Sequence, residues 1–244
     1  MRRFYCDEKN IIDGIVYFDK NESKHISKVL RLEKGEEIIV STGDGTDRYC
    51  TLIQSGEECS ARIDKTELNK SEPKSEIILF QSVIKNEKMD FLVQKVSELG
   101  ITKIVPIITE RTVVKIEDAK KEEKKQERWQ KIALEACKQC GRSRVPEVLK
   151  AIKLKDAKEI FNVCDEKFVC YEEEKTQNIT SAVRSVPTVG YFIGPEGGIT
   201  EEEHKFLKEQ GFISVSLGKR ILRAETAAIS AGAVILALMG EMDV

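Results

Sequence analysis

The chain has 244 residues, of which 41% are hydrophobic and 34% are charged, and its formal net charge is −2. A chain of this length and composition can bury one large core or two small ones, which excludes a largely disordered protein. The balance of 40 basic and 42 acidic residues excludes a polycation, but a local basic patch is enough to bind nucleic acid.

No membrane segment or export signal is expected. The longest apolar run, residues 227–240, is interrupted by Ser230 and is shorter than the about 20 residues that span a bilayer. The first residues lack the apolar core of a signal peptide, and the seven scattered cysteines are typical of reduced thiols, so we expect a cytoplasmic protein. Cys137 and Cys140 form a C-x-x-C pair without a second pair or two nearby histidines, and we therefore predict no metal site.

Residues 1–70 predict a small, mostly β domain. Residues 36–42 and 48–53 are β-like runs on either side of a Gly43-Asp44-Gly45 turn, which indicates a hairpin. Residues 60–66 supply another alternating run. Together these runs favour a compact barrel or sheet with one helix.

That helix is expected over residues 22–31. Its apolar face carries Ile26, Val29 and Leu30. Three cations recur at i, i+4 and i+7 and should share another face, namely Lys24, Lys28 and Arg31. Such a row is either a solvated charged face or a surface that contacts phosphates, and the sequence alone leaves both interpretations open.

A polar segment with a proline, residues 70–75, marks a domain boundary, and strands and helices then alternate through residues 74–244. Strands are predicted at 77–84, 103–108, 167–171, 188–193 and 212–217. Helices are predicted at 88–99, 120–140, 155–161, 200–210 and 224–239. This alternation is typical of an α/β domain with a parallel sheet that is covered on both faces.

Two loops near the C-terminus follow predicted strands and are rich in glycine. The first reads Gly194-Pro195-Glu196-Gly197-Gly198. It has neither the Walker nor the Rossmann spacing, so a nucleotide site of either kind is not supported. Its glycines would still let backbone groups approach a flat ligand, although a tight turn between strand and helix is the simpler alternative.

The second loop runs from Leu217 to Arg223 and leads into the most apolar helix of the chain. Ile221 and Leu222 are apolar residues among the cations of this loop. Exposure of such a pair to water is unfavourable unless it packs against an aromatic ring such as adenine.

These two loops, GPEGGIT-x-E and SLGKRILRAETAA, resemble the signature of the family that methylates N3 of a uridine in 16S ribosomal RNA, a branch of the knotted SPOUT superfamily. Three further stretches resemble other motifs of that family. They are residues 85–100, the run from Glu135 to Pro146, and the N-terminal residues together with the segment from His25 to Arg31.

The resemblance implies a PUA-like β-barrel in residues 1–70 that docks RNA. It also implies a parallel α/β domain in residues 74–244 whose C-terminal segment forms a trefoil knot. The implied cofactor is S-adenosylmethionine, the implied substrate is 16S ribosomal RNA in the 30S subunit, and the implied assembly is a homodimer. The cofactor would contact Tyr171, Ile193, Gly194, Pro195, Glu196, Gly197, Leu217, Gly218, Ile221, Leu222 and Thr226. RNA would contact Arg2, Arg3, Lys24, Lys28 and Arg31.

Methylation of uracil N3 requires that its proton be removed and that the resulting anion be stabilised. We predict that Arg223 stabilises this anion, and the alternative is an ion pair with Glu196 or Glu225. Those two carboxylates are candidates for the proton acceptor, although each is as readily expected to hold a loop in place. Arg142 and Arg144 are candidates for phosphate contacts, whereas His204 is expected at the surface.

Two other functions remain open from the sequence. One is a related methyltransferase that acts on tRNA or on another ribosomal RNA nucleotide. The other is a non-catalytic RNA-binding assembly factor, which would not bind S-adenosylmethionine.

Overall fold

The computed structural model describes residues 1–113 and 119–243, which form two compact units. Unit 1 comprises Met1–Glu72 and Cys137–Val145, and unit 2 comprises Pro73–Ala136 and Pro146–Val244. No helix within the two described ranges is both long and apolar enough to cross a bilayer.

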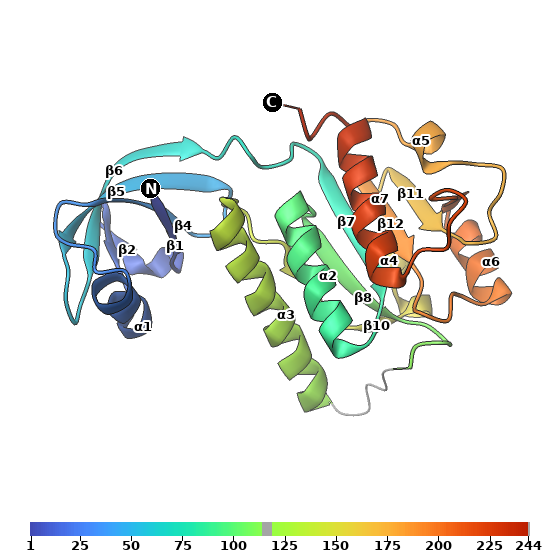
Figure 1. The fold of residues 1–244 in the computed structure, drawn as a ribbon, viewed down its shortest axis with the longest axis horizontal. Helices are drawn as coiled ribbons and strands as arrows, with labels where there is room; N and C mark the ends of the chain where they lie inside the picture. The colour runs from blue at the N-terminus through green and yellow to red at the C-terminus, as the bar shows by residue number, and fades with distance from the viewer. Residues whose placement is uncertain (114–118, 244) are drawn as a thin grey trace. The chain divides into compact units, whose positions relative to one another are not determined.

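Unit 1 is built on a six-stranded sheet in the order β1-β4-β5-β6-β3-β2 (Figure 1). Its strands are β1 (Arg2–Tyr5), β2 (Ile11–Ile12), β3 (Ile15–Tyr17), β4 (Glu37–Ser41), β5 (Thr46–Gln54) and β6 (Ser60–Leu68). The predicted hairpin is confirmed, because β4 and β5 pair antiparallel around Gly43 and Gly45, whose φ angles of 88° and 83° suit glycine. The core includes the fully buried Val16, Ile26 and Ile38.

The predicted helix of unit 1 begins and ends two residues earlier than expected and changes character midway. It consists of α1 (Lys20–Lys24) followed by a π-helical turn, η2 (His25–Val29), and a short 3-10 helix, η1 (Glu8–Asn10), precedes it in the chain. Arg31 lies beyond the helix with a φ of 52°, so the i, i+4, i+7 spacing does not place it on a helical face with Lys24 and Lys28. Val29 is 64% exposed, so its predicted place on the apolar face is also wrong.

Residues Cys137–Val145 belong to unit 1 because Ser143 joins a buried polar cluster there. Arg3 donates from Nη2 to Oδ2 of Asp47 at 2.9 Å and from Nη1 to Oγ of Ser143 at 2.6 Å. Asn69 donates to the same Ser143 Oγ at 2.9 Å. The predicted boundary near residue 70 did not anticipate this, because the partners lie far apart in the sequence.

Unit 2 is built on a seven-stranded parallel sheet in the order β10-β8-β7-β12-β11-β13, with β9 also paired to β8. Its strands are β7 (Glu76–Ser82), β8 (Lys103–Ile108), β9 (Glu147–Val148), β10 (Ile152–Lys153), β11 (Glu166–Cys170), β12 (Thr188–Ile193) and β13 (Ile213–Val215). The predicted parallel sheet is therefore present, and the predicted bounds of β8 and β12 are confirmed.

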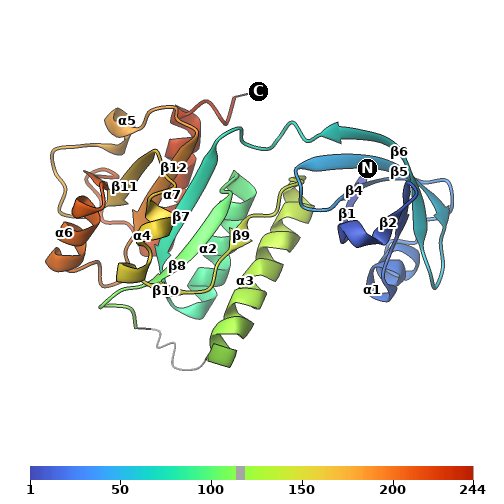
Figure 2. The same ribbon diagram turned by 180° about the vertical axis from the view of Figure 1, so that it is seen from behind.

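Helices cover both faces of this sheet (Figures 1 and 2). They are α2 (Asn86–Leu99), α3 (Ala119–Cys140, whose last turn belongs to unit 1), α4 (Lys158–Phe161), α5 (Ile179–Ala182), α6 (Glu201–Glu209) and α7 (Ala224–Leu238), with a 3-10 turn, η3 (Leu154–Asp156), before α4. Successive side chains of β7 point to opposite faces of the sheet, because side chains alternate along a strand with a period of two residues. Phe80 packs in a cluster with Phe161 of α4 and Leu207 of α6, on the face opposite α2 and α7.

A substitution of Asp47 tests whether the polar cluster around Ser143 stabilises unit 1. Burial alone would raise the pKa of Asp47, but hydrogen bonds from Arg3, Ser143 and Asn69 outweigh burial and lower it. A lowered pKa in the folded state stabilises the fold above the unfolded-state pKa, and this stabilisation is lost as the pH falls through the folded-state pKa. Asp47→Asn should therefore reduce stability at neutral pH by about 1.5–3 kcal/mol.

The same variant should also flatten the acid limb of the stability curve, which for this carboxyl begins at about pH 5 and continues below the unfolded-state pKa of about 3.9. Urea unfolding at a series of pH values measures both effects. Asp7→Asn, which removes an exposed ion pair with Lys9, is the control and should follow the wild type closely. If the free energy of unfolding falls with the same slope at acid pH in the wild type and in Asp47→Asn, the role of this carboxylate is contradicted.

Candidate active site

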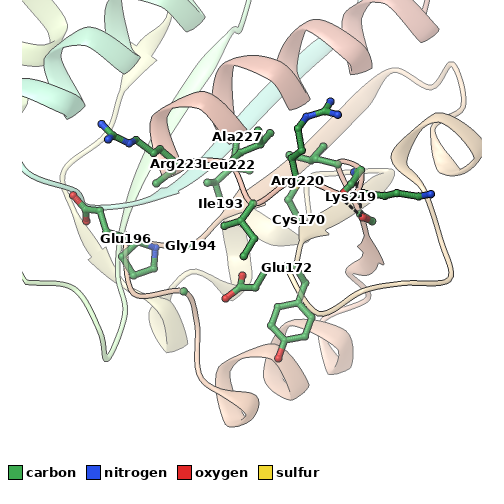
Figure 3. Close-up of a pocket in the computed structure, with 18 of the residues that line it drawn as sticks. Cys170, Glu172, Ile193, Gly194, Glu196, Lys219, Arg220, Leu222, Arg223 and Ala227 are labelled. Carbon is green, nitrogen blue, oxygen red and sulfur yellow. Dashed lines mark hydrogen bonds between the residues drawn. The ribbon is translucent and has the colours of Figure 1, made fainter.

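A cavity in unit 2 lies at the carboxyl ends of three neighbouring parallel strands and has a volume of about 460 Å³. Its walls come from the loops after β11, β12 and β13, together with residues of α2 and α7 (Figure 3). Crevices at this edge of a parallel sheet are where α/β proteins hold ligands, and the volume suits a molecule of cofactor size.

The loop after β12 is kept compact by glycines. A Cβ on Gly194 would lie 3.2 Å from Cγ2 of Ile199, which is tight. Gly198 has a left-handed φ of 69°, and a Cβ there would collide with Oε1 of Glu172 in the neighbouring loop. The loop then enters α6 through a capping box, in which Thr200 and Glu203 bond reciprocally, as predicted. The glycines thus let two cavity walls approach each other closely.

The loop after β13 supplies the apolar pair. Ile221 and Leu222 both line the cavity, and Ile221 is 91% exposed. Gly218 has a φ of 108°, which permits the turn that leads into this segment. In Figure 3, Leu222 and Ile193 lie in the middle of the cavity, between the charged residues of the two loops. This arrangement provides an apolar surface for a flat ring.

The loop after β11 begins with Tyr171, whose ring stacks on that of His204 with centroids 3.9 Å apart and an interplanar angle of 18°. His204 Nε2 is 2.9 Å from Oγ of Ser214. Burial, followed by the charge of Lys208, lowers the pKa of His204. His204, which was expected at the surface, is half-buried and supports a wall of the cavity through Tyr171.

Arg223 is the N-cap residue of α7 and lines the cavity. Neither Glu196 nor Glu225 forms an ion pair with it, nor does any other residue in the described ranges. Both carboxylates instead approach the Lys88 ammonium, with Nζ 3.8 Å from Oε1 of Glu196 and 3.6 Å from Oε2 of Glu225. The alternative interpretation of Arg223 as an ion-pair partner is therefore not supported by this arrangement.

Most residues predicted to contact the cofactor line this cavity. They are Tyr171, Ile193, Gly194, Pro195, Glu196, Leu217, Gly218, Ile221 and Leu222. Gly197 and Thr226 do not line it, nor does the predicted catalytic Glu225. The Gly197 carbonyl accepts a hydrogen bond from Nη1 of Arg111 at 2.9 Å.

Sequence reasoning missed several lining residues. They are Lys88, Cys170, Glu172, Gly198, Ser216, Ala224 and Ala227. Most of them lie next to predicted residues in the sequence, so the positions of the predicted loops could have indicated them. Lys88 lies in the stretch 85–100 that resembles a family motif, but the sequence did not place it at the cavity, because it reaches the cavity from α2, far away in the sequence.

One thiol, that of Cys170, lies among the residues that line the cavity. Burial raises the pKa of Cys170 to about 12, so this cavity residue stays a neutral thiol. Within the described residues, no group of histidine, cysteine and carboxylate side chains is arranged to hold a metal ion.

The cations predicted to contact RNA in unit 1 fall into two groups. Exposed side chains belong to Arg2, Lys24, Lys28, Arg31 and Arg144. Arg3 and Arg142 instead serve the fold: Arg3 pairs with Asp47, and Arg142, which is 3% exposed, donates from Nη2 to Oε2 of Glu72 at 2.9 Å. A guanidinium held in this way is not presented to a phosphate, so the prediction of an RNA contact is corrected for these two arginines.

Comparison with known proteins identifies the class. Residues 70–236 match the family model of an RNA methyltransferase domain, and residues 18–64 match that of an RNA methyltransferase PUA domain. The chain thus combines a methyltransferase domain that contains the cavity with a PUA-like domain in its N-terminal part.

The relatives define the family more closely. The chain is 36% identical to ribosomal RNA small subunit methyltransferase E of Bacillus subtilis, covering 86% of this chain and 85% of the relative. It is 35% identical to the protein of the same name from Aquifex aeolicus, over 94% of this chain and 96% of that one. The chain belongs to the ribosomal RNA small subunit methyltransferase E family.

Solved structures agree with this placement. The fold is similar to that of ribosomal RNA small subunit methyltransferase E from Neisseria gonorrhoeae bound to S-adenosyl methionine, with a TM-score of 0.86, 34% identity and 98% coverage of both chains. It is also similar to a putative methyltransferase from Legionella pneumophila in complex with the same cofactor, with a TM-score of 0.84, 32% identity and 96% coverage of both chains.

Gly198→Ala tests whether the close approach of two loops shapes the cofactor site. Alanine in a left-handed conformation is strained by about 1–2 kcal/mol, and its methyl group would displace the Glu172 carboxylate that lines the cavity. The affinity for S-adenosylmethionine, measured by calorimetry, should fall about 10-fold or more. Gly197→Ala is the matched comparison, because its Cβ would meet Arg111 at an ordinary 3.5 Å. Equal affinities for the two variants would overturn this description of the loop.

Proposed function

We propose that this chain transfers a methyl group from S-adenosylmethionine to N3 of a uridine in the 16S ribosomal RNA of the small subunit. Its family is that of an S-adenosylmethionine-dependent ribosomal RNA methyltransferase. The observation that carries the proposal is the cavity at the carboxyl ends of β11, β12 and β13, with the cation of Arg223 at its wall. Glycines and an apolar pair shape the same cavity, which suits the flat adenine and the close backbone contacts of this cofactor.

When bound, S-adenosylmethionine supplies an electrophilic methyl group, so the residues of the chain mainly position the nucleophile and manage its proton. Leu222 and Ile193 would contact the adenine ring. Backbone groups of the loops after β12 and β13 would hold the polar edges of the cofactor, and Glu172 adds a carboxylate to the same cavity.

Arg223 would stabilise the anion that forms when uracil N3 loses its proton. Its position at the N-terminus of α7 adds the favourable end of a helix dipole to the charge of the guanidinium. Since Arg223 has no ion-pair partner among the described residues, its donors remain available to an oxygen of the base.

Glu196 is the better of the two candidate proton acceptors. It lines the cavity, whereas Glu225 does not. Glu225 lies in the first turn of α7, where an acidic side chain stabilises the helix N-terminus. We therefore assign Glu225 to holding α7 and Glu196 to the proton.

We further propose that the C-terminal segment forms a trefoil knot and that the protein acts in the cytoplasm as a homodimer. Support for the knot comes from the chain path: β13 lies at the sheet edge beyond β11, yet α7 returns to pack on α2, β7 and β12. The connection, residues 216–223, must therefore cross the carboxyl ends of β11 and β12, where the other two loops lie. The exposed cations of unit 1 would contact phosphates of the RNA.

Arg223→Ala tests the catalytic assignment. Loss of a donor aimed at a developing anion should lower turnover about 100- to 1,000-fold. Calorimetric affinity for S-adenosylmethionine should stay within several-fold of wild type, because the guanidinium acts on the RNA base. Methyl transfer is measured with labelled cofactor on 30S subunits, naked ribosomal RNA and tRNA, which also separates the possible substrates. Intact turnover on every substrate would refute the role of Arg223.

Replacing Lys24, Lys28 and Arg31 together by glutamine tests the RNA surface of unit 1. RNA binding should weaken, and the slope of log K against log salt should become shallower by about 0.7–0.9 for each phosphate that the variant no longer neutralises. Lys65→Gln, which removes an exposed ion pair with Glu67 on β6 of the same unit, is the control and should leave the slope unchanged. If the triple variant keeps the wild-type affinity and slope, these cations form only a solvated face.

A further inference from the structure

We propose that Lys88 is a positioning residue of the methyl-transfer site, and that it acts by holding Glu225 so that the N-terminus of α7 presents Arg223 to the cavity. This inference rests on the proposed role of Arg223. It concerns a side chain from α2 that belongs to none of the three cofactor loops.

Lys88 is placed to join two walls of the site. Its ammonium lies 3.8 Å from a carboxylate oxygen of Glu196 in the loop after β12, and 3.6 Å from one of Glu225 in α7. The side chain also lines the cavity itself. The Lys88 ammonium therefore lies near one carboxylate from the loop after β12 and one carboxylate from α7.

The Glu225 carboxylate depends on this cation. Its Oε2 atom is buried and accepts no hydrogen bond within the described part of the chain. A buried carboxylate oxygen without a hydrogen bond is costly unless a nearby charge compensates it. Within the described residues, the Lys88 ammonium is the cation that pairs with this oxygen, so removing it would leave the carboxylate uncompensated and free to reorient.

Glu225 and Arg223 are mechanically linked through the start of the helix. Arg223 is the N-cap of α7, and Glu225 follows in the first turn. A change in the direction of Glu225 would shift the first turn and with it the origin of the Arg223 side chain. Displacement of a catalytic group by about 1 Å can lower a rate about 100-fold, so a small movement is enough to matter.

A double-mutant cycle tests this proposal on the full-length protein. Lys88→Met should lower kcat for methyl transfer about 100-fold, with little change in the KM for RNA and in the calorimetric affinity for S-adenosylmethionine. Lys88→Arg keeps a cation in reach and should restore most of the loss. Glu225→Gln should also reduce kcat, and the double variant Lys88→Met/Glu225→Gln should be no slower than Lys88→Met, because both act through one interaction.

Lys95→Met is the matched control, since Lys95 lies on the same helix and pairs with Glu98. It should leave kcat unchanged. Multiplicative losses in the double variant, or no rescue by arginine, would overturn the proposal. A lowered cofactor affinity in Lys88→Met would also overturn it, because Lys88 would then act on the cofactor.

The proposed function fails separately from this inference. It fails if the wild type does not bind S-adenosylmethionine or does not methylate RNA. The assigned role of Arg223 fails if Arg223→Ala keeps full turnover, whatever Lys88 does.

Discussion

The parallel pairing of β7, β12, β11 and β13 is the constraint on which the site depends. Parallel strands direct all their carboxyl ends to one edge, so loops that are distant in the sequence must meet there. The loops after β11, β12 and β13 become the walls of one cavity for this reason. Glycine at position 198 then decides how closely two of those walls approach, because any side chain there would strike Glu172. Backbone topology thus brings the loops together, and the smallest residue sets their spacing.

Strand and helix periodicity predicts this part of the fold well, because it reflects local burial. Residues 103–108 and 188–193 are almost wholly buried strands, and their apolar runs mark them with the observed bounds. Residues 22–31 were predicted less well, because a π-helical turn and the left-handed conformation of Arg31 alter the helical spacing without any change in the hydrophobic pattern. A left-handed residue that is not glycine gives no clear signal in the sequence.

Charged residues show where prediction from a single sequence reaches its limit. Arg3 and Arg31 are equally basic in the sequence, yet Arg3 is engaged by Asp47, whereas Arg31 is exposed. Arg142 likewise meets Glu72 across 70 positions of the chain. Whether a cation serves the fold or a ligand depends on acidic partners that only the tertiary structure brings near. The residues of the cofactor loops were easier to predict, because glycine and apolar residues in a loop are informative by themselves.

The same dependence on distant partners determines how the site keeps a usable cation. Glu196 and Glu225 lie on either side of Arg223 in the sequence, and either could have neutralised it. In the structure both carboxylates approach Lys88, and Arg223 has no ion-pair partner among the described residues. A guanidinium bound to a carboxylate would have to break that pair before it could stabilise an anion, at a cost in the transition state. The cation on α2 therefore occupies the local acids, and this leaves the cation at the start of α7 available for the substrate.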